Sequence, residues 1–252
     1  ATPGEVVLSI KNLVVKESRG LEAIKNMSLD VHRGEVVGIA GIDGNGQTEL
    51  IQALTGLRKV ESGTVTINGQ EMTGKSPRHI TEAGVGHVPE DRHKYGLILP
   101  LPLSENITLQ SYYHPPFSKH GILNFDEIDR YAKRLIEEYD VRTTSEKAPA
   151  GSLSGGNQQK VIFGRWLERN PHVFMMDEPT RGIDVGAKYE IYELIINMAK
   201  QGKTIIVVSS EMPEILGITN RIGVMSNGRL SGIVNTAETN QEELLTLSAK
   251  YL

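Results

Sequence analysis

Apolar and polar residues alternate along residues 5–15 and 27–40, and this period of two predicts β-strands separated by turns. The second stretch ends in Val36–Ala40, which is wholly apolar and typical of a buried parallel strand. A loop with three glycines follows, and apolar residues at helical spacing then predict a helix over 48–56. Another strand is expected at 64–70, turning at 68–69. The chain thus places a glycine loop between a buried strand and a helix.

Strands and helices alternate regularly again after residue 151. Helices are expected at 155–169, 186–200, 213–216 and from 241, and strands at 172–177, 204–209, 222–225 and 230–234. This alternation predicts an α/β domain with a mainly parallel sheet and helices on both faces. The segment from about Ile80 to Gly151 differs, because it contains six prolines and helical patterns at 104–111 and 126–139. We expect it to be a mostly helical insertion.

Composition leaves room for one large domain and excludes several kinds of chemistry. The 252 residues are 38% hydrophobic and 23% charged, as in globular proteins that bury a core. The net charge of −4 carries no basic excess that would favour nucleic acid as a partner. The absence of cysteine excludes disulfides and zinc–thiolate sites. No apolar run approaches the roughly 20 residues of a membrane-spanning helix, so we expect no direct membrane insertion.

The glycine loop has the pattern of a phosphate-binding loop with one substitution. The motif G-x-x-x-x-G-K-[ST] is matched at 41–48, except that glutamine stands at the lysine position. In such loops backbone N–H groups surround phosphate oxygens, the helix N-terminus adds partial positive charge, and the last hydroxyl binds magnesium. The predicted nucleotide-binding residues of this loop are Gly41, Asp43, Gly44, Asn45, Gly46, Gln47 and Thr48.

Gln47 offers a hydrogen bond to phosphate but no charge. A hydrogen bond to a charged group is worth roughly 1.5–3 kcal/mol, against about 1 kcal/mol for a neutral one. The loop is therefore expected to bind nucleotide more weakly than one with lysine. It should lose still more in the transition state, where lysine offsets developing charge. Taken alone, the loop also fits a turn that binds nothing.

Two later motifs favour the phosphate-binding interpretation. Residues 173–178 form an apolar strand that ends in Asp177, placed to hold magnesium through water, and Glu178, placed to orient or deprotonate a water molecule. About twenty residues before that strand, the octapeptide LSGGNQQK at 153–160 opens a helix with Ser154, Gly155 and Gly156. This is a second helix N-terminus suited to anions. Alone, the first motif could be a strand ending in a polar turn and the second an ordinary helix cap.

These motifs, in this order, resemble those of ATP-binding cassette (ABC) ATPases, and the resemblance covers essentially the whole chain. The variant details resemble the second, C-terminal cassette of the two-cassette ATPase of simple-sugar and nucleoside importers. The stretches that carry this finer resemblance are 38–41, 89–92, 179–186 and 209–214. Residues up to about 162 look more like the nucleoside-import branch, and those from about 164 like the galactose and methyl-galactoside branch, as in a mosaic.

The resemblance implies a P-loop NTPase of the ABC ATPase fold, with a mainly parallel core sheet and an antiparallel β subdomain. It also implies one domain over 1–252, with a helical subdomain inserted at about 90–155. ATP and Mg²⁺ are the implied cofactors. Glu90 stands where the family has glutamine and joins Thr48 and Asp177 as predicted metal residues. Ser210 replaces the family's switch histidine and is assigned, with Glu178, to the catalytic positions.

The resemblance further implies a head-to-tail pair of cassettes that hold ATP between the phosphate loop of one and the LSGG turn of the other. The implied partners are a second cassette, normally the N-terminal half of the same polypeptide, and transmembrane permease subunits that residues 95–106 would face. The implied location is cytoplasmic, on the inner face of the plasma membrane. In this hypothesis the chain's own site hydrolyses weakly, and residues 154–156 complete the site of the partner.

Two other functions stay open at this stage. The chain could be a regulatory or scaffold module in which ATP controls association without useful turnover, and both Gln47 and Ser210 favour this for the isolated chain. Whether the chain alone is an ATPase is therefore left open. A cassette working in DNA repair or translation is disfavoured by the acidic balance and by the lack of a long basic or coiled-coil segment. The transported solute is not encoded here.

Overall fold

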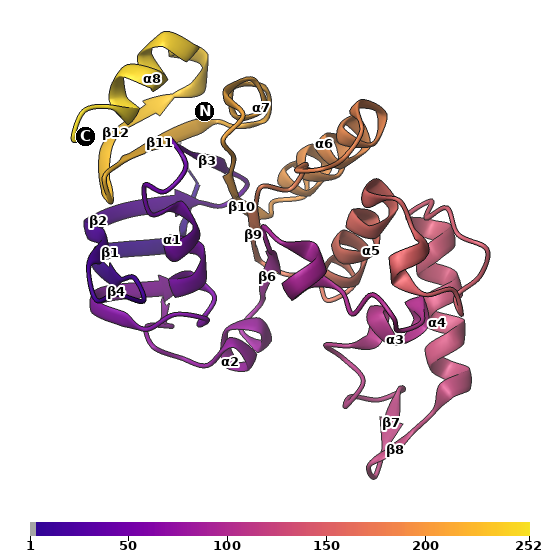
Figure 1. The fold of residues 1–252 in the computed structure, drawn as a ribbon. Helices are drawn as coiled ribbons and strands as arrows, with labels where there is room; N and C mark the ends of the chain where they lie inside the picture. Colours follow the sequence, from indigo (N-terminus) through magenta and orange to yellow (C-terminus); the bar gives the residue numbers. More distant parts are fainter. Residues whose placement is uncertain (1–3) are drawn as a thin grey trace. The chain divides into compact units, whose positions relative to one another are not determined.

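The computed structural model describes residues 4–252, so residues 1–3 of the predicted domain lie outside the described part. The chain forms two compact units. The first comprises residues 4–90, 171–179 and 192–252, and the second comprises 91–170 and 180–191. Figure 1 shows the order of the elements along the chain.

The first unit contains an antiparallel sheet and a larger, mainly parallel sheet. The antiparallel sheet has the order β2-β1-β4-β5, with strands β1 (Val6–Lys16), β2 (Glu22–His32), β4 (Val60–Ile67) and β5 (Gln70–Glu71). The larger sheet has the order β12-β11-β3-β10-β9-β6. Its strands are β3 (Val36–Ala40), β6 (Val85–Val88), β9 (Val173–Asp177), β10 (Thr204–Val208), β11 (Arg221–Ser226) and β12 (Arg229–Asn235). Only β12 pairs antiparallel in it, so the predicted α/β fold with a mainly parallel sheet is confirmed.

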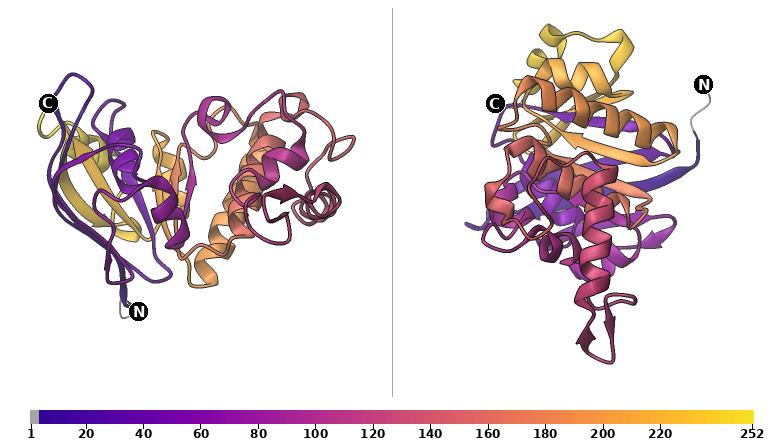
Figure 2. Two further views of the ribbon diagram at one scale, coloured as in Figure 1. Left: turned by 90° about the horizontal axis from the view of Figure 1, so that it is seen from below. Right: turned by 90° about the vertical axis from the view of Figure 1, so that its right-hand side faces the viewer.

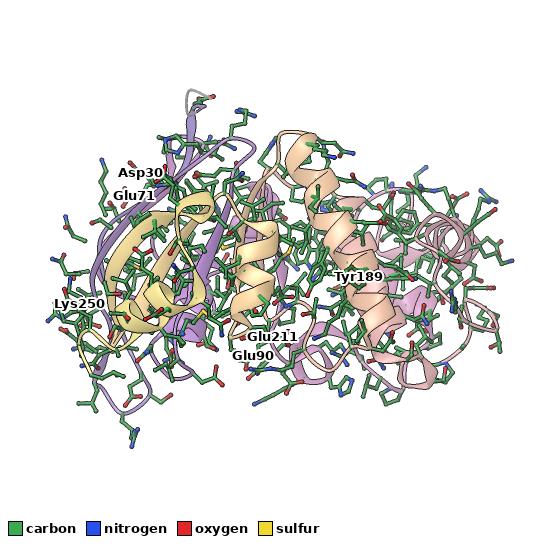
Figure 3. All side chains as sticks on the ribbon, turned by 90° about the horizontal axis from the view of Figure 1, so that it is seen from above. Asp30, Glu71, Glu90, Tyr189, Glu211 and Lys250 are labelled. Atoms are coloured by element: carbon green, nitrogen blue, oxygen red, sulfur yellow. The ribbon has the colours of Figure 1, made fainter. Side chains whose placement is uncertain are left out.

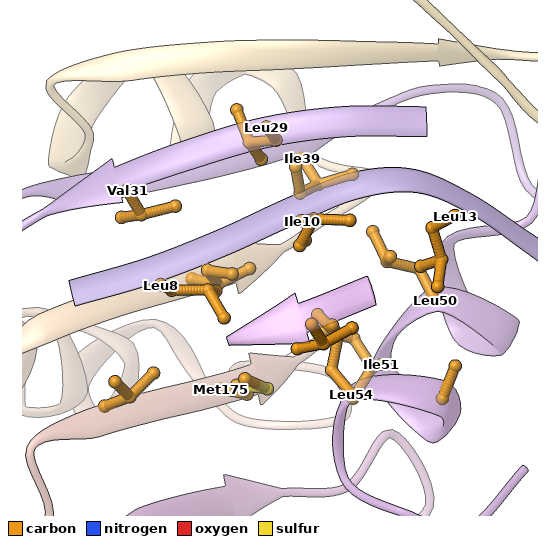
Figure 4. Close-up of a cluster of buried hydrophobic side chains, with 14 of the residues drawn as sticks. Leu8, Ile10, Leu13, Leu29, Val31, Ile39, Leu50, Ile51, Leu54 and Met175 are labelled. Carbon is orange, nitrogen blue, oxygen red and sulfur yellow. The ribbon is translucent and has the colours of Figure 1, made fainter. Parts of the chain in front are cut away.

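The hydrophobic core of the first unit joins both sheets and helix α1 (Gln47–Leu54). Leu50, Ile51 and Leu54 of α1 are buried with side chains of β1, β2 and β3 (Figure 4). Fully burying such a side chain is worth about 1.5–3 kcal/mol, so this packing anchors α1 and the loop before it. Three further short helices belong to the same unit: α2 (Pro77–Glu82), α7 (Met212–Ile218) and α8 (Gln241–Ser248).

The second unit is mostly helical. Its elements are a π-helical turn η1 (Arg92–Gly96), α3 (Leu103–Thr108), strands β7 (Ser118–Lys119) and β8 (Ile122–Leu123), α4 (Phe125–Glu138), a 3₁₀ turn η2 (Ala150–Ser152) and α5 (Gly155–Leu167). Figure 2 shows the β7–β8 hairpin at the N-terminal end of α4. Helix α6 (Val185–Lys200) begins in the second unit and ends in the first. In residues 4–252, none of the helices combines the length and the hydropathy that crossing a bilayer requires.

Two sequence expectations differ from the structure. The segment expected to be helical from about Ile80 contains β6, which pairs with β9 in the core sheet; the run is short and interrupted by Gly86 and His87, so its pattern is weak. The helical subdomain was expected to end near residue 155, whereas the second unit continues to 170. The reason is that α5 packs on α3 and α4, with Gly164 so near that an added Cβ would lie 2.8 Å from the Tyr139 ring.

Candidate functional site

The phosphate loop, residues 41–48, connects β3 to α1 and is fixed by backbone contacts. Gly46 has a φ of 101° at the N-cap of α1, a conformation that glycine adopts without strain. A Cβ on Gly46 would lie 2.4 Å from the Ala23 carbonyl oxygen of β2, so only glycine fits. Leu50 donates the first helical hydrogen bond, to the Gly46 carbonyl at 2.9 Å, which leaves the preceding amides outside the helical ladder. Such amides are the groups that bind phosphate oxygens in loops of this kind.

Gln47 folds back across its own loop. Its side-chain Nε2 donates to the Ile42 carbonyl oxygen at 3.1 Å, and the residue is buried. A Cβ on Gly41 would lie 2.6 Å from that nitrogen, so a glycine at 41 makes room for the amide. The amide nitrogen carries two hydrogens, and one of them is directed at Ile42. Gln47 therefore closes the loop as well as being a donor candidate for phosphate.

Asn45 has a structural partner outside the loop. Its Oδ1 accepts from the Asn227 amide at 3.1 Å, and its carbonyl oxygen accepts from the Gly228 amide at 3.1 Å. Lys25 of β2 donates through its own amide to the Gly228 carbonyl at 2.8 Å. The turn between β11 and β12 thus ties the phosphate loop to β2. The sequence indicates the Asn-Gly turn, but no pattern links it to a loop 182 residues earlier.

The predicted metal residues share a cavity of about 180 Å³ in the first unit. Its lining residues are Asp43, Gly44, Gln47, Thr48, Glu90, Asp177, Glu178, Val208, Ser209 and Ser210. Thr48 Oγ1 donates to Glu90 Oε2 at 3.2 Å, and Asp177 is buried at the end of β9. Figure 3 labels Glu90 among the side chains of this unit. A hydroxyl and two carboxylates provide the oxygen ligands that suit Mg²⁺, whose other ligands are commonly phosphate and water.

Glu178 is held in one orientation beside this cavity. Its φ is 49°, which is uncommon for a residue other than glycine and is frequent at functional sites. Its amide donates to Val208 at 2.8 Å, and its Oε1 accepts from the Ser210 amide at 2.7 Å. The Ser209 hydroxyl in turn bonds Glu214, so the turn that holds Glu178 is itself fixed. Ser210 acts on Glu178 through its backbone, a role that the sequence did not indicate.

The signature turn, residues 154–156, lies in the second unit and opens α5. Ser154 Oγ accepts from the Asn157 amide at 3.4 Å and from Asn157 Nδ2 at 2.8 Å. With both acceptor positions of the hydroxyl in use, its proton remains for an outside acceptor. A Cβ on Gly156 would lie 2.6 Å from the Ala187 Cβ, so the turn packs tightly on the start of α6. Ser154 and Gly156 line a cavity of about 250 Å³ together with Arg142, Asn157, Lys160, Asp184, Gly186, Ala187 and Glu190.

The predicted residues therefore form two groups, each within one unit. Thr48, Glu90, Asp177, Glu178 and Ser210 share the first cavity with the phosphate loop. Ser154 and Gly156 line the second cavity. The first group joins an anion-binding loop to oxygen ligands and a fixed carboxylate. That combination suits a magnesium-bound polyphosphate with a water molecule beside it.

Comparison with known proteins identifies relatives of this chain. The profile of the ABC transporter family matches residues 24–181. The chain is 51% identical over 244 residues to the nucleoside import ATP-binding protein NupA of Lactococcus lactis, covering 97% of this chain and 48% of that protein. It is 52% identical over 250 residues to the galactose/methyl galactoside import ATP-binding protein MglA of Treponema denticola, covering 99% and 49%. The chain thus spans about half the length of the curated relatives that it matches.

The fold has a close counterpart among solved structures. A nucleotide-free ATP-binding cassette from an ABC transporter superposes with a TM-score of 0.78 at 23% identity, covering 92% of each chain. At that identity the likeness concerns the fold alone. The family profile covers well over half of the chain, and two relatives are about half identical along nearly all of it. This chain therefore belongs to the ABC transporter family and has the fold of that family's ATP-binding domain.

Proposed function

We propose that this chain is the second, C-terminal cassette of the ATPase of an importer for simple sugars or nucleosides. Its relatives are named as import ATP-binding proteins for nucleosides and for galactosides, and the chain spans half of their length. The similar identities to the two groups support both solute classes. In this proposal the part up to about 162 is nucleoside-like and the part from about 164 is galactoside-like. Its partners would be a second cassette and transmembrane permease subunits, on the cytoplasmic face of the plasma membrane.

The chain's own phosphate loop forms the weaker of two ATP sites in this proposal. The observation that carries it is the Gln47 side chain, which bonds Ile42 at 3.1 Å and brings no charge to the cavity. ATP would bind through the loop amides, with Mg²⁺ held by Thr48, Glu90 and, through water, Asp177. When bound, the ion would draw charge from the phosphate oxygens.

Hydrolysis at this loop would be slow for two reasons that lie in its own residues. Gln47 cannot offset the negative charge that develops on the phosphate in the transition state. Ser210 cannot carry the charge of the histidine that the family has at this position. Glu178 remains able to accept a proton from water, and the Ser210 amide holds it in place at 2.7 Å. The site would thus keep its base and lack the lysine and histidine side chains that bring positive charge.

The signature turn would act in the partner's site. Ser154 has its hydroxyl proton free for an anion, and α5 directs its positive N-terminus to the same place. These groups would complete the pocket around the ATP that the partner's phosphate loop holds. The competing function, a regulatory module without turnover, predicts that adding the partner cassette produces no gain in hydrolysis.

Binding of ATP to the chain alone tests the weak-loop proposal. Gln47→Lys restores the charge at the loop, so we expect ATP to bind about tenfold more tightly, as for roughly 1.4 kcal/mol gained from a charged hydrogen bond. Gln201→Lys adds the same charge at an exposed position of the same unit and serves as the matched control. Calorimetric titration with magnesium-ATP measures both. Equal affinities in the two variants would mean that position 47 does not face phosphate.

A further inference from the structure

Arg92 connects three segments of the second unit. Its Nε donates to Gln158 Oε1 at 3.1 Å, on helix α5. Its Nη1 donates to the Arg181 carbonyl at 2.8 Å and its Nη2 to the Gly182 carbonyl at 3.4 Å. These carbonyls belong to the loop that follows β9 and leads into α6. One guanidinium therefore bonds α5 and this loop together from its own place in η1.

The neighbouring glycines fit around this guanidinium. A Cβ on Gly155 would lie 2.6 Å from Arg92 Nη2 and 2.8 Å from the Gly182 carbonyl oxygen. Gly182, at a φ of 69°, would bring its own Cβ to 3.5 Å from Nη2. Gly155 is the middle residue of the signature turn. The arginine, the signature turn and the loop at 181–182 therefore form one close-packed cluster.

Other contacts fix the position of Arg92 and of its partner Gln158. Asp91 Oδ1 accepts from the amides of His93 and Lys94 at 3.1 Å each, which fixes the start of η1. Gln158 Oε1 lies 2.9 Å from His93 Nε2, and Gln158 Nε2 donates to the Ala150 carbonyl at 3.2 Å. Partial burial lowers the pKa of Arg92, with the Asp91 charge acting in the opposite direction. The guanidinium stays charged because its pKa starts far above neutrality.

We propose that Arg92 is the positioning residue of the signature turn, holding residues 154–156 and the loop at 181–182 in one arrangement. This inference rests on the proposed function, because that turn serves the ATP site of the partner cassette. Only an arginine has the forked donors to reach a side chain and two carbonyls together. Lysine at position 92 would keep the charge and lose this fork.

Hydrogen exchange, measured on the chain alone, tests whether Arg92 fixes the signature turn and the loop at 181–182. In Arg92→Lys we expect exchange in the segments 154–165 and 180–188 to become about tenfold faster, the factor for one lost hydrogen bond, with other segments unchanged. In Gly155→Ala the added Cβ would clash with the Arg92 guanidinium, so we expect faster hydrogen exchange in the same two segments. Combined, the two changes should do no more than the larger one alone. The control is Arg130→Lys on α4, where the arginine is exposed and paired with Glu127. Unchanged exchange in these segments would overturn the proposal.

Turnover with the partner cassette separates this inference from the proposed function. We expect Arg92→Lys to lower kcat about tenfold while ATP binding to this chain's own loop stays the same. If Ser154→Ala lowers turnover but Arg92→Lys behaves like Arg130→Lys, the positioning role is wrong and the proposed function stands. If Ser154→Ala leaves turnover unchanged while hydrogen exchange in Arg92→Lys is faster, Arg92 does position the signature turn and the proposed function is wrong.

Discussion

Gly46 illustrates at the residue scale how the phosphate loop depends on backbone shape. Its left-handed φ and the Ala23 oxygen 2.4 Å from a Cβ both exclude a larger residue. Only the first of these reasons is visible in a motif. The second comes from β2, which the sequence places nearby only through the fold.

We expect Gly46→Ala to destabilise the protein by about 2–4 kcal/mol, from left-handed backbone strain of ~1 kcal/mol together with the clash. Gly202→Ala is the matched control, since Gly202 has a φ of 84° and no atom within 4 Å of an added Cβ. It should cost only about 1 kcal/mol. Denaturant unfolding measures both free energies. Equal losses would show that contact with Ala23 does not constrain the loop.

The residue scale also shows what the sequence cannot specify. Gln47 and Thr48 of the phosphate-loop motif and Asp177 and Glu178 of the later strand motif line one cavity, because both motifs follow strand ends of one parallel sheet. The phosphate-loop motif could not predict that the Gln47 amide bonds Ile42, because spacing sets proximity and not the choice of hydrogen-bond partner. The role of Arg92 was hidden for the same reason, since its partners lie 66 to 90 residues away.

At the element scale, a long helix such as α4 was predictable, whereas strands of two to four residues were not. Helix α4 buries Ile128, Ala132 and Leu135 at helical spacing, and Asn124 caps its N-terminus. Strand β6 has four residues, and β7 and β8 have two each, too few for a period to emerge. These strands form because a neighbouring strand supplies hydrogen-bond partners, and the sequence pattern does not show which strands are neighbours.

His87 on β6 makes the stability of the first unit depend on pH. Burial lowers the pKa of His87 to about 4 from the ordinary 6.5. The unfolded chain then binds a proton more readily than the folded one between these values. The free energy of unfolding therefore keeps the full contribution of neutral His87 above pH 6.5 and loses it as the pH drops towards 4.

His87→Gln removes this proton linkage. Between pH 7 and 4, we expect the wild-type protein to lose on the order of 2–3 kcal/mol more unfolding free energy than the variant. His79→Gln, at an exposed position on α2, is the control and should follow the wild type. Denaturant unfolding at a series of pH values measures the difference. Parallel curves for wild type and His87→Gln would contradict the burial argument.

At the scale of the whole molecule, the two units carry different groups of candidate site residues. The first unit carries a phosphate loop without its lysine, Glu178, and the oxygen atoms that would hold magnesium in the proposed function. The second carries the signature turn, whose N-cap Ser154 accepts hydrogen bonds from Asn157, and the cluster around Arg92. In the proposed assembly these groups serve two different ATP molecules. The variants of the two units should therefore affect hydrolysis independently.

Magnesium-dependent ATP hydrolysis, measured for this chain, for the partner cassette and for the two together, tests this central claim most directly. We predict little turnover by the chain alone and a clear gain on mixing. That gain should fall at least about tenfold in Ser154→Ala and persist in Glu178→Gln. Asn124→Ala removes a helix cap of the same kind from α4 and should leave the gain unchanged. Rapid hydrolysis by the isolated chain, or a gain lost in Glu178→Gln and kept in Ser154→Ala, would contradict the account.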